Sequence, residues 1–168
     1  MFKPGDDIVY GVNGVCRVES VGSLDMPGAK KDRIYYTLVP YHGGNGKIFT
    51  PADNEKVIIR SVISKDEAMD IINNIKDIGT LSLKDDKKRE CDYKEAINKC
   101  DCRELVKLIK TIYLRRQQRV SAGRRSTSED EKYLSLAEER LYGEFAVTLG
   151  IKKEEVKDYI ISRQQETI

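Results

Sequence analysis

The stretch FKPGDDIVYGVNGVCRV, Phe2 to Val18, decides how the first part of this chain folds. Asp7-Ile8-Val9-Tyr10 is β-branched and aromatic, a composition that favours a strand. Val12-Asn13-Gly14 supplies turn chemistry because Asn and Gly tolerate positive φ. Val15-Cys16-Arg17-Val18 then resumes a partly alternating pattern. The stretch therefore predicts two β-strands joined by a tight turn.

Several other functions do not fit this opening stretch. Its three glycines match neither a dinucleotide fingerprint nor a phosphate loop, since no Lys-Ser or Lys-Thr follows them. Asp6 and Asp7 and the missing apolar core also argue against a signal peptide. The sequence holds no run of 18 apolar residues, so we expect no membrane partner.

The opening strands belong to a longer all-β segment, residues 1–63. Loops rich in glycine and proline interrupt it, for example Met26-Pro27-Gly28. Five short strands in about 60 residues predict a small closed or half-open β-barrel of the SH3 or Tudor type. The expected strands are 7–10, 14–20, 33–39, 46–50 and 56–60.

After Ser61 the apolar residues change to helical spacing. Ser64 with Glu67 forms a capping box for a helix that Gly79 can end. We predict further helices around Leu105–Arg119, from a capping box at Ser128-Glu129-Asp130-Glu131 to Gly150, and around Tyr159, with a loop from Leu81 to Arg89. The fold class is therefore α+β, with a barrel domain at 1–63 and an all-α domain of four to five helices at 64–168.

The sequence contains no recognisable catalytic constellation. His42, the one histidine, sits in a glycine-rich loop, where a solvated side chain is more common than a general base. The four cysteines include no C-x2-C pair, so we expect no metal site. Because no catalytic constellation is recognisable, we also expect no cofactor and no small-molecule substrate. Cys100-Asp101-Cys102 leaves a redox or metal role as the alternative. Reduced thiols fit a cytoplasmic protein.

Basic residues are concentrated in one segment. Arg103 to Arg125 contains eight basic residues and one acid, which is +7 in a chain whose net charge is +2. This excess favours a polyanion partner, whereas the alternative is a helix that is basic because it is solvated. We predict DNA contact at Arg115, Arg116, Arg119, Arg124 and Arg125, with Lys87, Lys88 and Arg89 nearby.

Short motifs in a shared order resemble the CarD family of bacterial transcription regulators. Phe2-Lys3-Pro4-Gly5-Asp6, Val9-Tyr10 and Gly14-Val15 are similar to the family's opening F-x-x-G-D, V-Y and H-G-V, with Asn13 in place of histidine. Later motifs extend the resemblance over nearly the whole chain: Thr50-Pro51-Ala52-Asp53-Asn54, Val57-Ile58-Ile59-Arg60, Tyr93-Lys94, Leu114-Arg115-Arg116, Ser121-Ala122 and Ser128-x-x-Glu131.

This resemblance implies a specific, non-enzymatic function. In the family, the barrel is an RNA polymerase interaction domain that binds the β-subunit, and transcription-repair coupling factors carry the same module. The helical domain contacts promoter DNA at the upstream edge of the transcription bubble and stabilises the open complex. The resemblance also adds Lys94 to the DNA-contacting residues, and it places polymerase binding at Leu24, Asp25, Lys47 and Phe49.

The chain also departs from the family pattern. Many members carry a tryptophan four residues before the Tyr-Lys pair, where it acts as a wedge in the minor groove. Here Arg89 holds that place and the chain has no tryptophan, although Leu81 or Leu83 offers an apolar substitute. Leu24 and Phe49 stand where some members use arginines to bind polymerase.

The sequence therefore predicts a monomeric transcription regulator. Its partners are the RNA polymerase β-subunit and promoter DNA, which it contacts largely through phosphates. The alternative is a stand-alone nucleic-acid-binding protein that is not tethered to polymerase.

Overall fold

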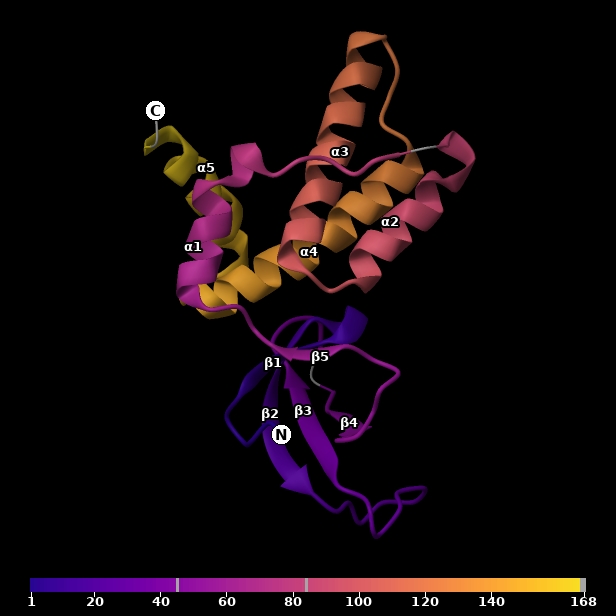
Figure 1. Ribbon diagram of the computed structural model, residues 1–168, viewed down its shortest axis with the longest axis vertical. Coiled ribbons are helices and arrows are strands. Elements are labelled where there is room, and N and C mark those ends of the chain that lie inside the picture. The colour runs from indigo at the N-terminus through magenta and orange to yellow at the C-terminus, as the bar shows by residue number, and fades with distance from the viewer. Residues whose placement is uncertain (45, 84, 167–168) are drawn as a thin grey trace. The chain divides into compact units, whose positions relative to one another are not determined.

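The computed structural model describes residues 1–44, 46–83 and 85–166. The chain separates into two compact units, Met1–Val62 and Ile63–Ile168. The first unit contains the strands and the second contains the α-helices (Figure 1). Within the described ranges, no helix is both long enough and apolar enough to cross a membrane.

The first unit is a five-stranded antiparallel sheet with the order β4-β3-β2-β1-β5. Because β4 and β5 are the two ends of this order, the sheet is not closed, and it corresponds to the half-open form of the expected barrel. The strands are β1 Asp7–Tyr10, β2 Val15–Gly22, β3 Tyr35–Pro40, β4 Ile48–Pro51 and β5 Ile59–Ser61.

A short 3-10 turn, Gly11–Asn13, joins β1 to β2, which confirms two strands in the opening stretch. Gly11 has φ +48°, and a Cβ atom on it would lie 2.6 Å from Val57 Cγ1. Its amide donates a hydrogen bond to the carbonyl of Ile58 at 2.8 Å. Only glycine fits such a close approach in this conformation.

The sheet has an apolar core face and a mixed outer face. Alternate residues of β1, β2 and β3 pack together in the core: Ile8, Tyr10, Cys16, Val18, Tyr36 and Leu38. On the opposite face, Arg17 pairs in register with Asp7 and Val39, and Phe49 pairs with Thr37. The register shifts between Val18 and Ser20, so that β2 bulges at Glu19.

The described residues of the second unit form five α-helices, within the four to five that the sequence predicts. Helix α3 packs on α4, α4 packs on α5, α2 packs on α3, and α1 contacts both α4 and α5 (Figure 1). Ser64 caps the first helix, since its Oγ accepts the amide of Glu67 at 3.1 Å. The helices are α1 Lys65–Asn73, α2 Arg89–Asn98, α3 Cys102–Ser121, α4 Ser128–Leu149 and α5 Lys153–Glu166.

Three local predictions in this unit are wrong. Helix α1 ends at Asn73, with Asn74 as its C-cap, and does not reach Gly79. The N-cap of α4 is Thr127 and not Ser128, because the Thr127 hydroxyl accepts the amide of Asp130 at 3.1 Å. The predicted loop from Leu81 ends early, since Asp86–Lys88 form a 3-10 turn and Arg89 begins α2. Sequence periodicity misses α2 because it buries only Tyr93, Ala96 and Ile97.

Candidate functional site

Strand β4 is one of the two edge strands of the sheet in the first unit, and β5 is the other. Within the described residues β4 pairs with β3 alone, so one side of its backbone is available to another strand. Phe49 lies on this strand and leaves 42% of its surface exposed. An exposed aromatic side chain on an open strand edge is typical of a surface that binds another protein.

The other residues predicted to bind polymerase lie in and around this edge. Lys47 comes just before β4, and its ammonium is 2.8 Å from the carboxylate of the bulged Glu19. Asp25 is exposed and Leu24 is half-buried in the loop that follows β2. Gly22, the last residue of β2, pairs with Tyr35, which also pairs with Pro51 at the end of β4. The loop with Leu24 therefore leaves the sheet at the end where β4 finishes.

Two further exposed side chains at this end of the sheet were not among the residues predicted to bind polymerase. Met26 and Ile34, in the same loop as Leu24, expose 44% and 46% of their surface. The Ile34 carbonyl accepts the Ala52 amide at 2.9 Å, which ties the loop to the chain after β4. Sequence patterns give no signal for these residues because an isolated loop apolar residue has no periodicity.

A polar cluster occupies the outer face of β1, β2 and the end of β3. The Tyr41 hydroxyl donates to Asp7 Oδ1 at 2.6 Å, and Arg17 Nε lies 3.3 Å from the same oxygen. Burial, and then the bond to Asp7, raise the pKa of Tyr41 to about 12. A shallow pocket of about 300 Å³ adjoins the cluster and is lined by Arg17, Glu19, Val39, Pro40 and Tyr41.

Comparison with protein families identifies this unit. Residues 2–63 match the family model described as the CarD-like/TRCF RID domain, where RID denotes the RNA polymerase interaction domain. The first unit of the chain belongs to this family. The comparison with curated proteins finds no match. The RID domain therefore gives the chain a transcription-related role and RNA polymerase as a partner.

Beyond the RID domain, a buried carboxylate organises the basic part of the helical unit. Asp130, in the first turn of α4, is fully buried. Its carboxylate accepts the Tyr93 hydroxyl at 2.8 Å and lies 3.1 Å from Arg115 Nε and 3.9 Å from Arg89 Nε. Arg89 also lies 3.4 Å from Glu129. Asp130 thereby joins α2, α3 and α4, and two arginines predicted to contact DNA compensate its charge.

Most cations of the +7 segment have partners inside the helical unit. Arg116 lies 2.6 Å from Glu131, and Arg119 donates to the carbonyl of Arg125 at 2.7 Å. The acids Glu129, Asp130 and Glu131 follow the segment in sequence, but α4 brings Asp130 and Glu131 against α3 and Glu129 against Arg89 of α2. Three further cations of the segment are also engaged: Arg103 with Asp70, Lys107 with Glu104, and Lys110 with the carbonyls of Ile75 and Lys76.

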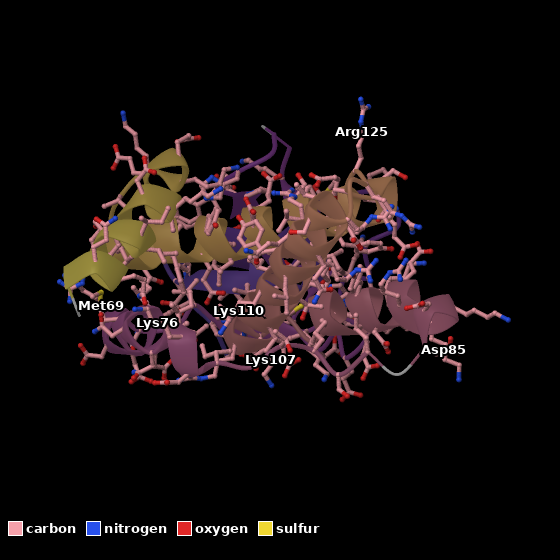
Figure 2. All side chains as sticks on the ribbon, turned by 90° about the horizontal axis from the view of Figure 1, so that it is seen from above. Met69, Lys76, Asp85, Lys107, Lys110 and Arg125 are labelled. Carbon is pink, nitrogen blue, oxygen red and sulfur yellow. The ribbon has the colours of Figure 1, made fainter. Side chains whose placement is uncertain are left out.

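A smaller set of cations remains exposed. Lys87 and Lys88 form the 3-10 turn before α2, and Arg124 and Arg125 form the loop before α4. These four side chains have no ion pair within the described ranges, and Figure 2 shows Arg125 projecting away from the ribbon. Lys94 is exposed too, although its ammonium lies 3.6 Å from Glu90. The positive charge available for binding therefore lies in the turn before α2 and in the loop before α4, and not along α3.

The structure also places the remaining candidate residues. Leu81 and Leu83 are half-buried against the helical core, and the Leu81 amide donates to Thr111 at 2.9 Å. The cysteines form no disulfide in the described part of the chain; Cys16, Cys100 and Cys102 are buried, while Cys91 is exposed. Among the described residues, no group of three or more potential metal ligands comes together.

Proposed function

We propose that this protein is a transcription regulator that binds the RNA polymerase β-subunit and holds promoter DNA at the upstream edge of the bubble. It stabilises the open complex and catalyses no reaction. The observation that carries the proposal is the RID domain at residues 2–63. The open β4 edge with its exposed Phe49 and the exposed cations of the helical unit support it.

Polymerase binds at β4 in this proposal. A strand of the partner adds to the unpaired edge, where main-chain hydrogen bonds supply affinity. Phe49 and the half-buried Leu24 contribute the apolar contacts, because aromatic anchors carry much of the binding energy at such interfaces. Lys47 and Asp25 lie at the polar rim, where charges act mainly on association rate and partner choice.

DNA binds at the helical unit through phosphates. Lys87, Lys88, Arg124 and Arg125 are the cations best placed for this contact, because no carboxylate neutralises them in the described structure. Such contacts are weak and independent of sequence. Docking on polymerase raises their effective concentration near one stretch of promoter, so that weak contacts suffice.

The polymerase half of the proposal is tested with full-length variants. Phe49→Asp places a charge on the β4 edge and should reduce retention of RNA polymerase at least about tenfold, since anchor residues contribute about 2 kcal/mol or more. The matched control is Val12→Asp, which changes an exposed apolar residue of the β1–β2 turn. Equal loss in both variants, or no loss in either, contradicts binding at β4.

Retention of RNA polymerase also distinguishes the proposed function from the alternative, a stand-alone nucleic-acid-binding protein. Polymerase without DNA should be retained by the wild-type chain, because the RID domain binds it directly. Retention that depends entirely on added DNA would favour the alternative. The thermal unfolding midpoint should stay unchanged in Phe49→Asp, because Phe49 is on the outer face of the sheet and not in the core.

A further inference from the structure

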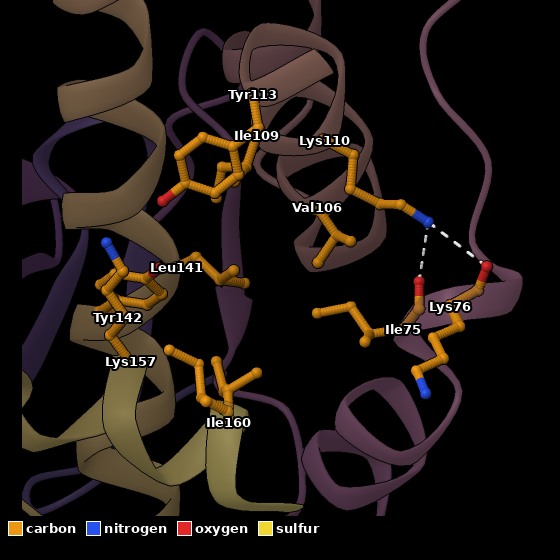
Figure 3. Close-up of a pocket in the computed structure, with 11 residues that line it drawn as sticks. Ile75, Lys76, Val106, Ile109, Lys110, Tyr113, Leu141, Tyr142, Lys157 and Ile160 are labelled. Atoms are coloured by element: carbon orange, nitrogen blue, oxygen red, sulfur yellow. Dashed lines mark hydrogen bonds between the residues drawn. The ribbon is translucent and has the colours of Figure 1, made fainter. Parts of the chain in front are cut away.

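The helical unit contains an apolar pocket that plays no part in the proposed function. Its volume is about 260 Å³, and it lies among α3, α4, α5 and the 3-10 turn Ile75–Asp77 (Figure 3). The buried side chains Val106, Ile109, Leu141 and Ile160 form much of its wall. A space of this size and polarity is suited to an apolar group and not to ordered water.

The charged residues that line the pocket are all cations. They are Lys76, Lys110 and Lys157, and no acid is among the lining residues. The Lys110 ammonium already donates to the carbonyls of Ile75 and Lys76, at 2.9 and 3.5 Å (Figure 3). Lys157 is exposed and lies 5.8 Å from the centre of the Tyr113 ring, with no carboxylate partner in the described residues.

The two tyrosines that line the pocket do not bring a negative charge to Lys157. The Tyr113 hydroxyl donates to Glu138 at 2.6 Å, so that nearby carboxylate is already engaged. Burial raises the pKa of Tyr142 to about 12, and its hydroxyl therefore stays neutral at neutral pH. Lys157 is left as the cation able to meet a negative group at this side of the pocket.

We infer that this pocket binds a small amphipathic anion, a carboxylate with an apolar body of about ten carbon atoms. The size follows from volume, since a cavity of about 150 Å³ holds benzene. The carboxylate pairs with Lys157 while the apolar body contacts Val106, Ile109 and Leu141. A partner helix is a poorer occupant, because Ile161 is the one exposed apolar residue among those lining the pocket.

Titration of the isotopically labelled full-length chain with decanoate tests this inference. Amide shifts should saturate at one ligand per chain and centre on the pocket residues of α3, α4 and α5. Along a series from acetate to dodecanoate, affinity should rise about threefold to fourfold with each CH₂ buried and level off near ten carbons. Decanol, which has the chain without the charge, should bind more weakly than decanoate.

Substitutions at Lys157 test the contribution of charge. Lys157→Met keeps the apolar stem and should weaken decanoate binding about fivefold, since an exposed ion pair contributes a factor of a few. Lys157→Arg should restore it, and Lys152→Met is the matched control because Lys152 is exposed and does not line the pocket. These residues lie outside the polymerase and DNA surfaces, so failure here leaves the proposed function intact.

Three results would overturn the inference. The first is a set of shifts that does not saturate or spreads over the surface. The second is equal binding of decanol and decanoate, or of wild type and Lys157→Met. The third is perturbation of the pocket resonances by RNA polymerase but not by decanoate, which would assign the pocket to a protein side chain.

Discussion

At the scale of single residues, Asp130 shows how a charge serves structure. Burying a carboxylate is costly unless cations and donors surround it, and here Arg115, Arg89 and Tyr93 do so. Burial and the bond to Asp130 raise the pKa of Tyr93, which keeps that hydroxyl a donor. Arg115 therefore belongs to the helical core as much as to its surface.

Asp130→Ala should lower the free energy of unfolding of the helical unit by about 3–5 kcal/mol, because it leaves two arginines beside an empty buried site. Urea unfolding monitored by circular dichroism measures the change. The control is Glu131→Ala, in which the exposed partner of Arg116 is removed and the expected cost is at most about 1 kcal/mol. Equal costs for both variants would refute the structural role of Asp130.

Tyr41 predicts a pH dependence in the RID domain. Its pKa is about 12 in the folded chain and 10.0 when unperturbed, so folding favours the neutral phenol. The stabilisation is complete below pH 10 and is lost as the pH rises through 12.

In Tyr41→Phe, the loss of folding stability that comes from ionisation of Tyr41 at alkaline pH should disappear. The variant should be less stable than wild type at neutral pH, by about 1 kcal/mol for the lost hydrogen bond to Asp7. The difference should narrow at about pH 11. Urea midpoints of both proteins at the two pH values provide the test, and a gap that widens with pH would contradict the assignment.

At the scale of elements, α4 positions the beginning of the helical unit. Glu144 on this helix is 2% exposed, and its carboxylate accepts the Ile63 amide at 2.9 Å and lies 3.2 Å from Cys102 Sγ. One turn later, the Thr148 hydroxyl donates to the Ile63 carbonyl at 3.0 Å. Both backbone groups of Ile63 are thus held by α4, directly before the N-cap of α1.

Glu144→Ala should cost about 2–4 kcal/mol of unfolding free energy. It leaves the Ile63 amide without its acceptor and removes buried side-chain volume. Glu95→Ala is the control, since Glu95 is exposed on α2 and makes only a long contact of 3.9 Å to Lys99. Thermal unfolding of both variants provides the test. An unfolding midpoint of Glu144→Ala equal to that of the control would contradict the role of Glu144 in holding Ile63.

At the scale of the whole molecule, the proposed bridge predicts separable effects of charge and docking. Reversing Lys87, Lys88, Arg124 and Arg125 to glutamate should flatten the plot of log K for DNA against log salt by up to about four units, since each phosphate contact contributes about 0.9. Open-complex lifetime should fall, while polymerase retention stays at the wild-type level. Equilibrium DNA binding at several salt concentrations measures the slope, and open-complex decay measures the lifetime.

The control for this variant reverses lysines elsewhere on the surface, Lys65 and Lys152, which are exposed and outside the candidate surface. An equal salt slope in wild type, control and variant would mean that the exposed cations are solvated surface charges that do not contact DNA. Arg115→Glu is unsuitable for this test, because a second carboxylate beside Asp130 would destabilise the fold.

Sequence alone was sufficient for the features that depend on local order along the chain. Alternation and turn residues predicted the strands of the first unit, and the motifs from Phe2 to Arg60 led to the RID family that the comparison confirms. The Ser64 cap and the apolar stripes predicted most helices. These signals can be read from the sequence because backbone hydrogen bonds and side-chain directions repeat at a fixed residue spacing in helices and strands.

Only the tertiary structure decided which charges are available. Along the chain, Arg115 and Arg116 are part of a +7 segment, but packing of α4 on α3 brings Asp130 and Glu131 against them. Packing of the helices also buries Glu144 and forms the pocket beside Lys157. In the first unit, the order of the strands leaves the β4 edge open to a partner strand. Electrostatic partners are set by distance in space, and a sequence records only distance along the chain.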